Sequence, residues 1–205
     1  MLYRVFDGHC DTPVELWLQE KQLRSSDLAV SLDKAAGLGG YAQFFAFCTA
    51  CIKTRMPHTE HFSRALDYFL AQLRKNEDRI TLCRTAPEAE AAMQAGKCAA
   101  FLAVEGAEAV REDEGLLELA YEAGVRMVSL VWNLPNGLSG SCQPGEGHLA
   151  LGADLDGCSV LPEGFAALND YETLGRYLAD AGYPDETIQN LFCNSLMKVV
   201  KTCIM

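Results

Sequence analysis

Short apolar runs alternate along this chain with longer stretches of helical periodicity, and this alternation limits the possible folds more than any other feature. The predicted strands occupy residues 2–6, 42–48, 99–106, 125–132 and 148–157. The predicted helices occupy residues 59–76, 86–96, 115–124, 170–182 and 184–202. Such alternation is typical of an α/β fold with a parallel sheet or barrel. We therefore expect one domain over residues 1–205, with its chemistry at the carboxyl ends of the strands.

Ionisable residues follow three of the predicted strands at that end. His9 and Asp11 follow the first strand, Glu105 lies at the end of the third, and Asp154 and Asp156 lie at the end of the fifth. Each group has a neighbouring glycine, which lets the backbone turn sharply and a ligand come close: Gly8, Gly106 and Gly157. One imidazole and several carboxylates suit a divalent cation such as zinc. Taken singly, each acid could instead cap the helix after its strand.

Composition narrows the possible partners. The chain has 205 residues, a formal net charge of −11 and a pI of about 4.8. No stretch is strongly basic, so we expect no nucleic-acid partner. No apolar run has the length of a membrane span and the N-terminus lacks a signal-peptide pattern, so we expect no membrane association.

The nine cysteines, including the C-x-x-C of Cys48 and Cys51, are expected to be reduced thiols in a cytoplasmic protein.

Several segments resemble the membrane dipeptidase (renal dipeptidase) family of zinc metallopeptidases. "DGHCDTP" at residues 7–13 is similar to its D-G-H-x-D-x-P opening, and "AVEG" at 103–106 is similar to its glutamate strand. "LVWNLPN" at 130–136 resembles its fourth-strand segment. "HLALGADLDGCSVLPEGF" at 148–165 resembles its G-S-D-F-D-G…P-E-G segment, and "DETIQNLFCNSLMKVV" at 185–200 resembles its closing helix. The segments occur in family order.

The resemblance implies a TIM-barrel-like (β/α) metallo-dependent hydrolase that uses a pair of zinc ions to hydrolyse dipeptides. His9 and Asp11 would hold one ion, and Glu105 would bridge both ions and share in catalysis. Asp154 would be the acid–base carboxylate, and a metal-bound hydroxide would attack the peptide carbonyl. We expect Trp132, Asn133 and Asp156 to contact the substrate, a small dipeptide.

The sequence departs from the family pattern after the fourth predicted strand. The family has three further barrel strands there, with two histidines for the second zinc and an arginine for the substrate carboxylate. Here only residues 137–147 intervene, which is too short for one βα unit. We therefore expect an incomplete or shortened barrel with open edges beside the fourth and fifth strands, which a homo-oligomer could cover.

The other histidines offer few replacements for the missing ligands. His148 begins its predicted strand and so belongs to the wrong end of a barrel. His58 and His61 are three residues apart near the start of a predicted helix and remain alternatives as ligands. Two other functions stay open: a catalytically impaired homologue that binds metal or ligand, and a single-metal hydrolase of amides or lactones.

Overall fold

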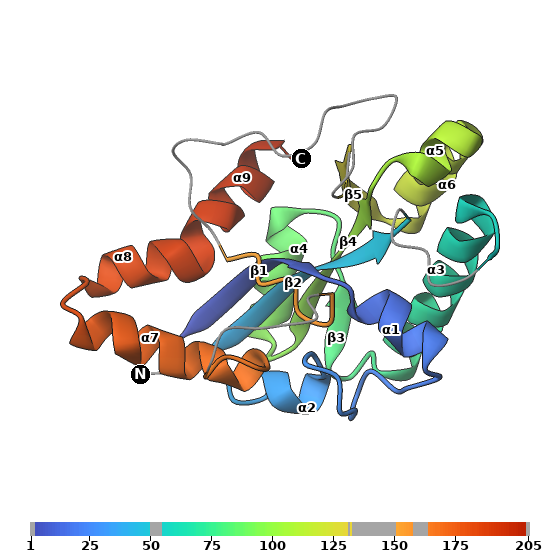
Figure 1. The fold of residues 1–205 in the computed structure, drawn as a ribbon. Coiled ribbons are helices and arrows are strands. Elements are labelled where there is room, and N and C mark those ends of the chain that lie inside the picture. Colours follow the sequence, from blue (N-terminus) through green and yellow to red (C-terminus); the bar gives the residue numbers. More distant parts are fainter. Residues whose placement is uncertain (1–2, 50–54, 131, 133–150, 158–163, 204–205) are drawn as a thin grey trace.

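A computed structural model of the chain describes residues 3–49, 55–130, 132, 151–157 and 164–203 (Figure 1). Its centre is a parallel five-stranded sheet. The strands are β1 (Arg4–Cys10), β2 (Gly40–Cys48), β3 (Ile80–Leu82), β4 (Cys98–Glu105) and β5 (Val125–Ser129). The predicted strands at 2–6, 42–48, 99–106 and 125–132 are confirmed as β1, β2, β4 and β5. The short β3 was not predicted.

The order of the strands brings distant parts of the chain together. β1 pairs with β2, and β2 pairs with β4. β4 then pairs with β3 near its start and with β5 near its end. On the other side of β1, residues 151–155 make two isolated parallel bridges, Asp7 with Leu151 and Cys10 with Leu155. The predicted strand 148–157 is thus seen as bridges instead of a continuous ladder, and residues 148–150 lie outside the described part of the chain.

Helices cover both faces of this sheet. Those in the first two-thirds of the chain are α1 (Thr12–Leu18), α2 (Leu32–Ala35), α3 (His58–Lys75), α4 (Ala86–Gln94), α5 (Glu108–Glu112) and α6 (Gly115–Ala123). The later ones are α7 (Tyr171–Asp180), α8 (Asp185–Gln189) and α9 (Ser195–Cys203), with a π-helical turn at Asn190–Asn194 between the last two. The helix predicted over 184–202 is therefore interrupted by this turn.

Each face has its own apolar core. On one face, Phe45 and Phe47 of β2 pack against the α3 side chains Phe62 and Phe69. On the other, Phe6, Phe44 and Phe101 stack on one another, in a cluster that also includes apolar side chains of α4 and α9. Figure 1 shows α7 to α9 beyond the β1 side of the sheet, and α3, α5 and α6 beyond its β5 side. Burial on both faces explains why the strands are continuous apolar runs.

The cysteines differ in part from the reduced set expected from the sequence. Cys48 is disulfide-bonded, so the prediction that all nine are thiols is wrong at this position. Cys10, Cys83, Cys98 and Cys193 are free and buried, and burial raises the pKa of each thiol, for Cys83 to about 12. Across the described ranges, no helix combines the length and the apolar character needed to span a bilayer.

Candidate metal centre

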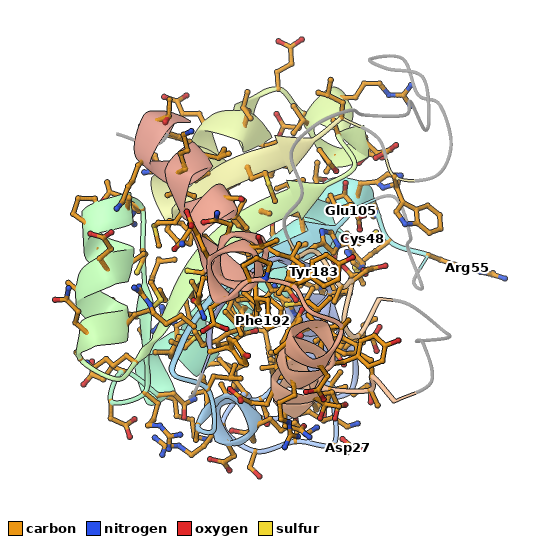
Figure 2. All side chains as sticks on the ribbon, turned by 90° about the vertical axis from the view of Figure 1, so that its left-hand side faces the viewer. Asp27, Cys48, Arg55, Glu105, Tyr183 and Phe192 are labelled. Carbon is orange, nitrogen blue, oxygen red and sulfur yellow. The ribbon has the colours of Figure 1, made fainter. Side chains whose placement is uncertain are left out.

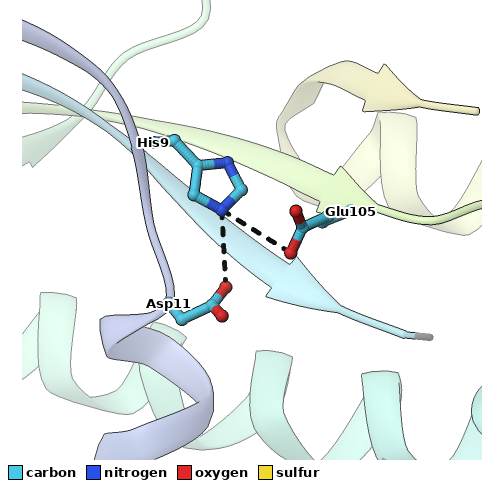
Figure 3. Close-up of side chains that lie close together, drawn as sticks. All are labelled: His9, Asp11 and Glu105. Carbon is cyan, nitrogen blue, oxygen red and sulfur yellow. Dashed lines mark ion pairs between the residues drawn. The ribbon is translucent and has the colours of Figure 1, made fainter. Parts of the chain in front are cut away.

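Three side chains from β1, the start of α1 and the end of β4 meet at the carboxyl end of the sheet (Figure 3). His9 Nε2 lies 3.6 Å from Asp11 Oδ1 and 3.6 Å from Glu105 Oε2. Asp154 adds a fourth group, with Oδ1 3.4 Å from His9 Nε2. The structure therefore brings together four predicted site residues that are far apart in the sequence.

An irregularity in β1 directs His9 toward Glu105. Asp7 pairs with Gln43 and Cys10 pairs with Phe45, so β1 uses one residue more than β2 over this stretch. Such a bulge reverses the side-chain alternation beyond it. Accordingly, Cys10 packs in the same core as Val5, although strict alternation would place them on opposite faces. His9 is thereby moved to the face of Phe6, the side on which Glu105 also lies.

Neither Asp11 nor Glu105 caps a helix with its side chain, which was the alternative explanation for these acids. Asp11 stands immediately before α1 but makes no capping hydrogen bond with its side chain. Glu105 ends β4 beside Cys48, the last residue of β2 (Figure 2). The helix α5 begins only at Glu108, after an Ala107 N-cap that has no side-chain capping bond. Both carboxylates point toward His9 instead (Figure 3).

Gly157 leaves the space into which two of the carboxylates fit. A Cβ on this residue would clash with Asp154 Oδ1 and would lie 2.6 Å from Asp11 Oδ2. The backbone of Asp154 has a left-handed φ of 53°, and the amide of Gly157 donates to the Asp154 carbonyl at 3.1 Å. The chain thus turns tightly here so that the two carboxylates share one side of the site.

The electrostatics of the cluster favour bound positive charge. Burial alone would lower the pKa of His9, but the nearby carboxylates of Asp11 and Glu105 outweigh burial and raise that pKa to about 10. The atoms His9 Nε2, Asp11 Oδ1 and Glu105 Oε2 are buried and have no hydrogen-bond partner. A buried polar atom without a hydrogen bond destabilises the folded state unless another group, such as a bound cation, satisfies it.

These three atoms fit a divalent cation. All of them lie within 4.8 Å of one another. Ligand atoms about 2 Å from a common zinc ion lie about 3 to 4 Å apart, which is close to the separations observed. One nitrogen and several carboxylate oxygens are also a donor set that zinc and related ions accept. The fold and this cluster together are those of metal-dependent hydrolases built on a parallel β/α barrel.

Comparison with known families identifies the particular family of metal-dependent hydrolases. Residues 2–147 match the sequence profile of the membrane dipeptidase family, peptidase family M19. Because this match covers well over half of the chain, the chain belongs to the membrane dipeptidase family. The matched residues end before Asp154 and Asp156, so the placement of these two acids rests on the geometry above.

Individual relatives agree with this assignment. A protein described as uncharacterized, in the PQQ-III 3′ region of Acinetobacter calcoaceticus, is 26% identical over 160 residues, or 64% of this chain. Those residues are 50% of that protein, so the chain spans about half the length of the curated relative it matches.

Two solved structures share the fold. Dipeptidase AC, a metallopeptidase, aligns with a TM-score of 0.81 at 15% identity, over 100% of this chain and 99% of its own. A metallopeptidase from Rhodobacter sphaeroides, liganded with a phosphinate mimic of the dipeptide L-Ala-D-Ala, aligns with a TM-score of 0.81 at 15% identity. This alignment covers 99% of the present chain and 100% of the other. The predicted TIM-barrel-like fold is therefore confirmed.

The other residues predicted for the site are not part of the described cluster around His9. Trp132 is 39% exposed, whereas Asn133 and His148 lie outside the described residues. His58 places Nδ1 against the Thr49 carbonyl and Nε2 3.6 Å from Glu112 Oε1.

His61 is buried and packs edge-to-face on Trp17, with ring centroids 5.1 Å apart. Within the described part of the chain, neither His58 nor His61 joins the cluster around His9. The structure therefore gives no support to these two histidines as replacement ligands.

Sequence reasoning missed Asp7, a fully buried carboxylate on β1. Its Oδ1 accepts hydrogen bonds from the amides of His9 at 2.9 Å and Ala153 at 3.3 Å, and its Oδ2 accepts one from the Tyr171 hydroxyl. Burial raises the pKa of Asp7 in spite of these bonds. The signal was an acid inside an apolar strand, a position that a charged residue occupies only when it has partners.

Proposed function

We propose that this chain is a metallodipeptidase whose cation is held by His9, Asp11 and Glu105. The observation that carries the proposal is the convergence of three buried, unpartnered ligand atoms at the carboxyl ends of the strands. Family membership and the dipeptide mimic bound to the Rhodobacter sphaeroides relative support dipeptides as substrates. A bound divalent cation supplies Lewis acidity that polarises the peptide carbonyl and favours attack by water.

Asp154 is placed to move the protons of this reaction. Its carboxylate is 39% exposed, more than the other three side chains at the site, and its Oδ1 reaches His9 Nε2 at 3.4 Å. In hydrolysis, Asp154 accepts a proton from the attacking water and passes it to the leaving amine. The exposed Trp132 forms part of the wall against the substrate.

Zinc is the proposed cation, with one ion per chain favoured by the residues described. His9 is the single imidazole in the described cluster, where a two-zinc site of the family type would need more. This ligand set also leaves room for a single-metal hydrolase of amides or lactones. A cytoplasmic location, one domain and a possible homo-oligomer stay predictions.

The test combines elemental analysis with peptide hydrolysis. Protein purified without added metal should contain about one zinc per chain and should cleave L-Ala-D-Ala. Cleavage should stop with a chelator and return with zinc. Glu105→Ala should lose both metal and activity, while Glu118→Ala, an exposed acid on α6, should keep both.

Each other outcome has a definite meaning. If Glu105→Ala leaves dipeptide cleavage unchanged, the proposed metal site is wrong. If the wild-type chain binds zinc but cleaves no dipeptide, the chain is an impaired homologue or acts on another amide or lactone. Retention of activity after complete metal removal would exclude the proposed chemistry.

A further inference from the structure

Asp156 lies two residues after Asp154, and both of its carboxylate oxygens are already occupied. Its Oδ2 accepts a hydrogen bond from Thr12 Oγ1 at 2.6 Å and another from the amide of Val30 at 3.3 Å. Its Oδ1 accepts one from the amide of Ala29 at 2.6 Å. Burial raises the pKa of Asp156, and these bonds oppose that shift. A carboxylate held this way is committed to the protein itself.

The carboxylates of Asp11 and Asp154 meet at Gly157, and Asp156 is linked to the backbone beside each of them. Thr12 directly follows Asp11, so the bond from Thr12 to Asp156 fixes the backbone beside one of them. The second carboxylate, Asp154, belongs to the same tight turn as Asp156. The amide of Asp11 also donates to the Leu155 carbonyl at 3.0 Å, which ties the two segments together between the acids.

The turn needs such a support because its backbone is strained. Asp154 and Asp156 have left-handed φ values of 53° and 69°, a conformation that L-residues seldom adopt. Strain of this kind persists only where the surrounding structure imposes it. Among the described residues of this segment, two isolated bridges join it to β1, so backbone pairing provides little of that support.

Asp7 holds the opposite end of the turn. Its Oδ1 accepts from the amide of Ala153, the residue before Asp154, and from the amide of His9. Asp154 therefore lies between two carboxylates that bond to the protein, the fully buried Asp7 and the partly buried Asp156. Neither of them needs to touch a substrate to affect the site.

We propose that Asp156 is a positioning residue, which holds Asp11 and Asp154 at the cation site through Thr12 and the amides of Ala29 and Val30. This inference rests on the proposed metal-dependent function and replaces the expectation that Asp156 contacts the substrate. Partners that orient metal ligands typically change metal affinity by 10- to 100-fold when they are removed. Asp156 belongs to this kind of partner because its bonds determine where the two carboxylates stand.

The experiment compares Asp156→Ala with Glu88→Ala. Glu88 is a matched control because its carboxylate also accepts two backbone hydrogen bonds, from the amides of Arg84 and Thr85, but it caps α4. Calorimetric titration with Zn²⁺ gives the affinity, and the visible absorption of the Co²⁺ protein reports the geometry of the ligands. Asp156→Ala should weaken Zn²⁺ binding about tenfold or more and alter the Co²⁺ spectrum. Glu88→Ala should leave both unchanged, and Asp156→Asn, which keeps one acceptor oxygen, should be intermediate.

Separate outcomes address the inference and the function on which it rests. If wild-type protein binds no Zn²⁺ and no Co²⁺, the proposed function fails. If the wild-type protein binds Zn²⁺ and Asp156→Ala binds it equally well with an unchanged Co²⁺ spectrum, the positioning role is overturned and the proposed function survives. A raised KM with unchanged Zn²⁺ affinity would instead show that Asp156 contacts the substrate.

A second variant keeps the inference testable if Asp156→Ala does not fold. Thr12→Val removes the hydroxyl that donates to Asp156 while keeping the shape of the side chain. Thr12→Val should change the Co²⁺ spectrum. It should also weaken Zn²⁺ binding, by less than the roughly tenfold or more expected for Asp156→Ala. An unchanged spectrum and an unchanged affinity in Thr12→Val would overturn the inference.

Discussion

Gly157 is the residue that most directly limits the geometry of the site. A Cβ at this position would clash with Asp154 Oδ1 and lie 2.6 Å from Asp11 Oδ2, whereas a Cβ on Gly152 would meet nothing within 4 Å. We expect Gly157→Ala to displace both carboxylates and to weaken Zn²⁺ binding at least tenfold, by the magnitudes known for ligand reorientation. Gly152→Ala, on the same segment, should bind as wild type. Titration calorimetry decides, and equal affinities for the two variants would contradict this account of the site.

The residues of the site were predictable from the sequence, but the backbone geometry that brings them together was not. His9, Asp11, Glu105 and Asp154 were predicted as site residues, and they do lie together. The register shift in β1 that moves His9 to the side of Glu105 leaves no local signal, because it depends on pairing with β2. The same holds for the bonds of Asp156, whose partners lie more than 120 residues away.

At the scale of an element, α7 shows a conflict between helix propensity and packing. Gly175 lies inside this helix, where alanine normally stabilises by about 0.5–1 kcal/mol. Here a Cβ would lie 2.5 and 2.7 Å from two ring atoms of Tyr3, which also packs against Phe192 with ring centroids 5.3 Å apart. We therefore expect Gly175→Ala to lower the free energy of unfolding by about 1–3 kcal/mol, as overpacking does.

Urea unfolding monitored by circular dichroism measures this change. Thr173→Ala, at an exposed position of the same helix, should stay within about 0.5 kcal/mol of wild type, as surface substitutions usually do. A Gly175→Ala protein as stable as wild type would show that Tyr3 moves aside without cost.

The long helix α3 was predictable, whereas several of the short elements were not. The helix predicted over 59–76 is found at His58–Lys75 because its apolar stripe repeats over several turns. The α1, α2 and α5 helices and β3 have seven residues or fewer, too short for a periodic pattern to emerge. The π-helical turn at Asn190–Asn194 likewise follows from packing against β1, since no glycine or proline marks it.

At the scale of the whole molecule, a cation would join parts of the chain that are distant in sequence. His9 and Asp11 belong to the N-terminal strand and helix, whereas Glu105 ends β4 near the middle of the chain. Asp154 stands in the segment bridged to β1. The unfolded chain does not bring these groups together, so the folded state should bind the cation more tightly. Binding energy then adds to folding energy.

The last prediction follows from this linkage. Free Zn²⁺ at 100 times its dissociation constant should stabilise the protein by about 2.7 kcal/mol, if the unfolded chain does not bind it. For a chain of this size, that corresponds to a rise in Tm of roughly 5–10 °C, which a chelator should reverse. The Tm of Glu105→Ala should be insensitive to both additions, because one of the three converging ligands is gone, while Glu118→Ala should respond like wild type. An equal rise in Tm for Glu105→Ala would place the stabilising ion elsewhere in the chain and would separate it from the site at the strand ends.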